Sequence, residues 1–174
     1  MDEAFIKKVQ PNSPEAEKSV IGSMLMDRDA IIEVADVLVK EDFYQNTNGI
    51  LYEAMVELYR EGKPVDLITL QNKLKEKQVP ESIQSLDYIR ELVEAVPTSA
   101  NAKQYAGIVR EKSILRKLIK VTEKITADCY LGKDEFSTIL EETEKDVFHL
   151  LQNASGREDF VPIRDVVLNT LDQI

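Results

Sequence analysis

The chain has 174 residues, a length suited to one domain with a tail or to two small subdomains. Hydrophobic residues make up 43% of it, enough for a packed core, and the net charge of -10 disfavours a chain that grips nucleic acid by neutralising phosphates. The sequence shows neither a signal-peptide pattern nor an apolar run near the roughly 20 residues of a membrane helix, so we expect a soluble, cytoplasmic protein without membrane contact.

Helical periodicity dominates, and strand signals of period two are nearly absent, so the sequence predicts an all-α fold. Residues 1–100 are expected to form a globular head, a compact bundle of about five short helices. The first expected helix begins at Pro14 with Ser13 as N-cap, and the second includes Ile31 to Leu38. The third runs from Asn46 or Asn48 to Gly62, and the fourth follows the N-cap Asp66. The fifth spans Ser82 to Val96 and ends before Pro97.

Residues 101–152 are expected to form a long antiparallel helical hairpin. An amphipathic helix from about Asn101 to Tyr130 and another from about Asp134 to Gln152 are separated only by Leu131-Gly132-Lys133. So short a turn makes two long helices fold back on each other. Two helices alone cannot bury both apolar stripes, so we predict that the hairpin needs another copy of the chain or another protein.

The predicted seam of the hairpin consists of apolar residues at near-heptad spacing. These seam residues are Leu115, Leu118, Phe136, Leu140, Val147 and Phe148. The apolar arc of the first helix is wider than one partner helix would cover. The spare residues could pack on the head, but the length of the hairpin favours a dimer seam or a docking site.

Lys103, Arg110, Lys117 and Lys124 recur every seven residues and form a basic stripe along the first helix. Most of these charges are expected to be solvated, or to set the register of packed helices against the acidic return helix. The alternative function is a nucleic-acid-binding helical module in which the stripe lines a channel for single strands. Such channels also use stacking aromatic residues, and Tyr105 is the only one within the stripe.

No catalytic residue and no metal site is predicted. The sole histidine, His149, and the sole cysteine, Cys129, lie in different expected helices, which disfavours nucleophilic triads and metal sites. No G-x-x-x-x-G-K-[ST] loop or G-x-G-x-x-G turn occurs, so no nucleotide cofactor is expected in this chain. Cys129 cannot form an internal disulfide, and we expect an ordinary buried thiol.

Residues 153–174 are expected to be a linker and the start of a linker helix. The linker includes Ala154-Ser155-Gly156, and Pro162 opens the helix, which has an unpaired apolar side. This pattern suggests a fragment of a longer protein.

Several short runs of the chain are informative together. They are Pro14-Glu15-Ala16-Glu17, Glu41-Asp42-Phe43-Tyr44, Glu61-Gly62-Lys63-Pro64-Val65-Asp66, Tyr88-Ile89 with Leu92, and Pro97-Thr98-Ser99-Ala100-Asn101 followed by Tyr105-Ala106 and Ile108-Val109-Arg110-Glu111-Lys112. In their order and spacing these runs resemble the amino-terminal domain of bacterial replicative DNA helicases of the DnaB family. The resemblance covers roughly residues 11–152. The chain departs from the family at Asn46-Thr47-Asn48, where a histidine is common, and at Gln84-Ser85, where Gly-Gly is common.

The resemblance implies a head and a hairpin that assemble as dimers, as a trimer of dimers and as a hexamer, forming a collar on the helicase ring. It implies that the collar binds the helicase-binding domain of primase, with a helicase loader as a further candidate partner. The linker helix would dock on a neighbouring subunit's motor. ATP and Mg would bind in that RecA-like motor, which is absent from this chain, and DNA would be met mainly by the full-length ring at the nucleoid.

Three apolar residues that the seam leaves partly uncovered are the candidates for primase contact. They are Tyr88, Ile119 and Ile125. A tyrosine suits such a site because it buries a large area at small entropic cost while its hydroxyl stays wet. The alternative for each is plain core packing.

Overall fold

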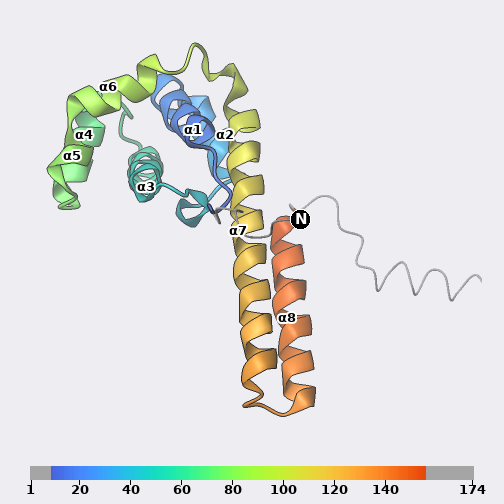
Figure 1. Ribbon diagram of the computed structural model, residues 1–174. Helices are drawn as coiled ribbons and strands as arrows, with labels where there is room; N and C mark the ends of the chain where they lie inside the picture. The colour runs from blue at the N-terminus through green and yellow to red at the C-terminus, as the bar shows by residue number, and fades with distance from the viewer. Residues whose placement is uncertain (1–8, 156–174) are drawn as a thin grey trace, which may run out of the picture. The chain divides into compact units, whose positions relative to one another are not determined.

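The computed structural model describes residues 9–155, and all regular secondary structure in that range is helical (Figure 1). The elements are α1 (Pro14–Met26), α2 (Arg28–Ala35), the 3-10 turn η2 (Lys40–Asp42), α3 (Asn46–Arg60), α4 (Leu67–Glu76), α5 (Glu81–Gln84), α6 (Leu86–Glu94), the 3-10 turn η3 (Ser99–Asn101), α7 (Ala102–Leu131) and α8 (Phe136–Ala154). The all-α prediction is confirmed. The expected linker helix lies outside the described residues, and the first two residues of the expected linker belong to α8.

The chain divides into two compact units between Arg116 and Lys117, inside α7. The first unit is the head, which holds the elements from α1 to η3 and the first half of α7. The second is the hairpin, which holds the rest of α7 and α8. The division therefore falls within the long helix, and the head includes residues that the sequence assigns to the hairpin.

Side-chain caps explain where the early helices begin. The Ser13 hydroxyl accepts a hydrogen bond from the Ala16 N–H at 3.4 Å, with Pro14 at the first helical position, as expected. The Asp27 carboxylate accepts from the Asp29 N–H at 2.9 Å and starts α2. The second helix therefore begins at Arg28. It ends at Ala35, before Leu38, where the apolar pattern predicted its end.

The third helix ends where the sequence predicted, and the fourth helix begins at its predicted N-cap. Gly62 has φ of +69°, and its N–H donates to the Tyr59 carbonyl while the Lys63 N–H donates to the Leu58 carbonyl. The Asp66 carboxylate accepts from the backbone N–H groups of Ile68 and Thr69, which caps α4.

The prediction of a single helix from Ser82 to Val96 is wrong. Ser85 is extended, with φ of -60° and ψ of 124°, and it separates α5 from α6. The Gln84 side chain donates to the Val79 carbonyl, and the Gln71 amide donates to the Gln84 carbonyl at 3.0 Å. These side-chain bonds to backbone oxygens stabilise the break, which apolar periodicity does not reveal.

The core of the head forms where α1 packs against α2, α3 and α6. Val20, Ile21, Leu51, Leu70 and Ile89 are each fully buried in it. A Cβ at Gly22 would collide with the Leu92 carbonyl, so the absence of a side chain there allows α1 and α6 to approach closely.

Glu17 is a buried carboxylate of α1 that binds the residues at the start of α3. It accepts from the N–H groups of Tyr44 at 2.7 Å and Gln45 at 3.1 Å, and from the Asn48 amide at 3.0 Å. Gln45, the residue before α3, makes no capping bond with its own side chain. The negative charge at the start of α3 therefore comes from α1, which ties the two helices together.

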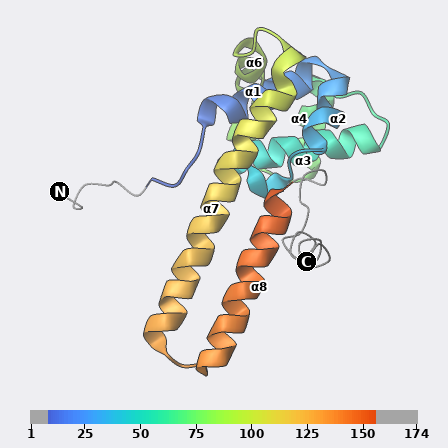
Figure 2. The same cartoon turned by 90° about the vertical axis from the view of Figure 1, so that its right-hand side faces the viewer.

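In the hairpin unit, α8 runs beside the second half of α7 in the opposite direction (Figure 2). Gly132, with φ of +54°, lies in the short connection between them. A positive φ suits glycine, which explains its place in the turn. The antiparallel hairpin is as predicted.

Candidate protein-interaction surface

The first half of α7 is held in the head by a buried carboxylate. Asp42 is fully buried, and its oxygens accept from Arg110 Nη1 at 3.1 Å, from Ser113 Oγ at 2.7 Å and from the Val39 N–H at 3.0 Å. A buried charge is tolerated when it is paired and hydrogen-bonded in this way. The Asp42 network therefore joins α7 to the turn η2.

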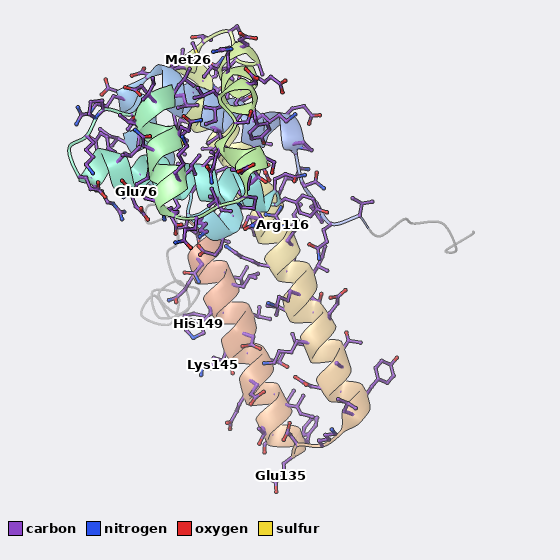
Figure 3. All side chains as sticks on the ribbon, turned by 90° about the vertical axis from the view of Figure 1, so that its left-hand side faces the viewer. Met26, Glu76, Arg116, Glu135, Lys145 and His149 are labelled. Carbon is purple, nitrogen blue, oxygen red and sulfur yellow. The ribbon has the colours of Figure 1, made fainter. Side chains whose placement is uncertain are left out.

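Arg116 extends this attachment at the end of the head unit (Figure 3). Its guanidinium donates to the Pro11 carbonyl at 2.7 Å and to the Asp42 carbonyl at 2.5 Å. It also lies 5.6 Å from the centroid of the Tyr44 ring, a cation–π contact. Arg116 thus fixes the segment before α1 and the loop after η2 to the same turn of α7.

The basic stripe is therefore not a row of free cations. Arg110 is bound to Asp42, and Lys124 Nζ lies 2.6 Å from Asp146 Oδ2. Lys117 also has an interaction of its own, while Lys103 is exposed. Nucleic acid would have to displace existing contacts at most of these positions, which weakens the single-strand channel hypothesis.

A second set of charges joins α3 to α4 on the head. Lys40, Glu53, Lys77, Glu57, Lys73 and Glu61 form a continuous ladder of ion pairs. Hydrogen bonds from the ammonium groups of Lys63 and Lys73 lower the pKa of Glu61 to about 2. The neighbouring hollow of about 200 Å³ includes Lys73 in its lining, and that ammonium is already paired with the ladder's carboxylates.

The contact line between α7 and α8 is only half-buried. We infer the contact line from the residues that are half-buried on each helix, which are Val121, Ile125 and Asp128 on α7 and Ile139, Thr143, Asp146, Val147 and Leu150 on α8. No residue between 117 and 155 is buried in the single chain. The hairpin unit therefore lacks a core of its own.

Large apolar residues lie outside the contact line and are exposed. Leu118 and Ile119 on α7 are 40% and 36% exposed, and on α8 the values are 78% for Phe136, 53% for Leu140, 55% for Phe148 and 44% for Leu151. We call these six residues the apolar face. Leu115, 43% exposed, continues it along α7.

The ion pairs of Lys124 show that both halves of the apolar face lie on one side of the hairpin. Lys124 contacts Asp146 and Glu142, so these three side chains share a side. Counted at about 100° per residue, Lys124 and Glu142 lie on one side of the contact line, Asp146 borders the line on that side, and the apolar residues lie on the other side. The hairpin therefore has an apolar face and an opposite, charged face.

The predicted seam residues and primase-contact residues lie in three different places: the contact line, the exposed surface of the helices and the head. Of the six seam residues, only Val147 is half-buried in the contact line, and the other five are exposed. Ile119 is on the apolar face, whereas Ile125 is half-buried in the contact line. Tyr88 belongs to the head unit, where it packs partly buried against the core.

The expectation for Cys129 is wrong, because its thiol is exposed. Cys129 lies outside the contact line, near the end of α7, where the hairpin offers no core to cover it. Sequence reasoning also missed the buried acids Glu17 and Asp42. Their only signal was their place in the short runs that resemble a known family, since an acidic residue alone does not predict burial.

In residues 9–155, no cluster of three or more His, Cys, Asp or Glu is arranged to hold a metal ion. No helix in that range is long and apolar enough to cross a membrane. A helical head that carries a coreless hairpin with an apolar face defines a protein-interaction module, because exposed apolar patches of this kind mark contacts between proteins.

Comparison with known proteins identifies the module. Residues 9–111 match the family model of the DnaB-like helicase N-terminal domain, and the chain belongs to this family. It is 36% identical over its full length to the replicative DNA helicase DnaB of Geobacillus stearothermophilus, of which it spans 38%. The chain thus covers well under half of that relative's length.

Solved structures agree with this family. The N-terminal domain of DnaB helicase from Mycobacterium tuberculosis matches with a TM-score of 0.77 and 31% identity, over 81% of this chain and 99% of that one. The N-terminal domain of DnaB helicase from Helicobacter pylori, studied with its interactions with primase, matches with a TM-score of 0.57 and 27% identity, over 67% and 90% of the two chains.

Proposed function

We propose that this chain is the amino-terminal assembly and primase-binding domain of a hexameric replicative DNA helicase. Family membership supports this function, and so does the similarity to relatives named as replicative helicases. The observation that carries it is the apolar face, which the single chain leaves exposed. The full-length protein would unwind DNA at the replication fork with ATP and Mg bound in a separate motor domain, and this chain would supply no catalytic residue.

The apolar face is proposed to be covered partly by other copies of the chain and partly by primase. Leu115, Leu118, Phe136, Leu140, Val147 and Phe148 would form the seam between subunits in dimers, in a trimer of dimers and in the hexamer. Five of these residues are exposed in the single chain, so self-association would remove large apolar side chains from water. Residues 153–174 would lead toward the motor domain.

Primase is the proposed second partner. The name of the Helicobacter pylori relative supports this assignment, since that domain was studied with its primase interactions. Ile119 and Ile125 on the hairpin and Tyr88 on the head are the proposed contacts, and a helicase loader is a further proposed partner. The complex would act in the cytoplasm at the nucleoid, with DNA reached mainly through the full-length ring.

Two measurements test the proposal. Sedimentation velocity of the chain over a concentration series should show self-association, and the helicase-binding domain of the cognate primase should bind it. Ile119→Asp should weaken primase binding because it places a charge on the apolar face, without loss of helix content by circular dichroism. Lys18→Asp, at an exposed position on α1, is the control. A strictly monomeric chain that does not bind primase would refute the proposed function.

A further inference from the structure

α7 and α8 each carry an apolar stripe, and the two stripes have the same residue spacing. In each stripe the second of the four positions is a charged residue. The stripe on α7 consists of Ile108, Leu115 and Ile119, with Lys112 between the first two. The stripe on α8 consists of Leu140, Val147 and Leu151, with Glu144 between the first two. Both follow the pattern i, i+4, i+7, i+11, which places all four positions on one side of a helix.

The two charged residues have opposite signs and are not used within the chain. Among the described residues, neither the Lys112 ammonium nor the Glu144 carboxylate has a hydrogen bond or an ion pair. Glu144 is exposed between apolar neighbours, since Leu140 is 53% exposed and Leu151 is 44% exposed. Any protein that covers this stripe must remove Glu144 from water and is favoured if it brings a cation to it.

We propose that the occupant of the α8 stripe is the α7 stripe of a second copy, with an ion pair between Glu144 of one copy and Lys112 of the other. This inference rests on the self-association proposed above and adds the residues that set its specificity. When the two stripes are aligned, Lys112 lies within one helical turn of Glu144 whether the helices run parallel or antiparallel. When the two helices run parallel, the equal spacing also sets each apolar residue of one stripe against an apolar residue of the other.

The pair also explains how an acidic chain can recognise itself. With a net charge of -10, two copies repel each other at long range, and a contact between like stripes would bring equal charges together. A contact between unlike stripes instead sets Lys112 against Glu144, which selects one alignment over others. In a two-fold dimer this contact occurs twice, because the α7 stripe of each copy meets the α8 stripe of the other.

A charge exchange tests the pair in the 174-residue chain by sedimentation velocity over a concentration series. Glu144→Lys alone and Lys112→Glu alone should each raise the dissociation constant of self-association by about tenfold or more, because each sets like charges together. The combined variant should return to within about threefold of the natural chain, since the pair is restored in reverse. Circular dichroism of all variants verifies that helix content is unchanged.

Glu141→Lys and Lys120→Glu are matched controls, because they make the same charge changes at exposed residues outside the stripes. These should change the dissociation constant by less than about twofold. If the natural chain associates but the controls weaken it as much as the test variants, or if the combined variant is not restored, the pair is refuted and the proposed function stands. If the natural chain stays monomeric, the proposed self-association itself fails.

Discussion

Replacing Asp42 tests whether a buried carboxylate attaches α7 to the head. Asp42→Ala removes the acceptor of the Arg110 guanidinium, the Ser113 hydroxyl and the Val39 N–H. The Arg110 side chain can turn toward water, whereas the buried Ser113 hydroxyl and the partly buried Val39 N–H would lose their partner. At about 1–3 kcal/mol for each unsatisfied buried group, we expect the free energy of unfolding to fall by about 3 kcal/mol.

The assay is urea denaturation followed by circular dichroism, with amide hydrogen exchange in α3 as a local measure of the head. Glu41→Ala is the matched control, because Glu41 is the neighbouring acid but is exposed, and its loss should cost less than about 0.5 kcal/mol. Asp42→Ala combined with Arg110→Ala should cost less than the sum of the two single changes, since they share one interaction. A loss for Asp42→Ala as small as that for Glu41→Ala would refute the reasoning.

Three further outcomes are expected. Gly22→Ala should lower the free energy of unfolding by about 1–3 kcal/mol in the same urea assay, because the added methyl meets the backbone of α6; an unchanged midpoint would contradict the close approach. The Tyr52 hydroxyl donates to the Leu38 carbonyl at 2.6 Å, and burial raises the pKa of Tyr52 to about 12. Folding therefore favours neutral Tyr52, and stability that is present below pH 10 should be lost as the pH rises toward 12, a loss that Tyr52→Phe should abolish in alkaline titrations. Finally, Lys63→Met should raise the pKa of Glu61 from about 2 toward its usual value, measured by NMR titration of the carboxyl; an unmoved pKa would assign the shift to another group.

The linear pattern of the chain was sufficient for the elements whose signals are local. Ser13-Pro14, Gly62 and Asp66 mark helix ends because a cap forms within three or four residues of the helix that it serves. The hairpin was also predictable, because two long apolar periodicities with Gly132 between them leave few other arrangements. The break at Ser85 was missed because it depends on the Gln71 and Gln84 side chains rather than on periodicity.

The interaction surface was predictable only in outline. Apolar spacing identified the residues of the hairpin that need a cover, but it could not divide them between the contact line and the apolar face. Val147 and Ile125 are half-buried against the opposite helix, whereas Leu118 and Phe136 remain exposed. That division depends on the rotation of each helix about its own axis, which packing between the helices decides.

The helical class, most helix ends and the need of the hairpin for a partner can be predicted from the order of residues, because these features follow from spacing, caps and turns within short stretches. Which charged side chains are paired with distant residues becomes clear only in the folded chain. Arg110 looked solvated but is bound to Asp42, and Glu17 binds the residues at the start of a helix that begins 29 residues later in the chain. Such pairings join residues far apart in sequence, and the free energy that favours them arises only when folding removes both groups from water.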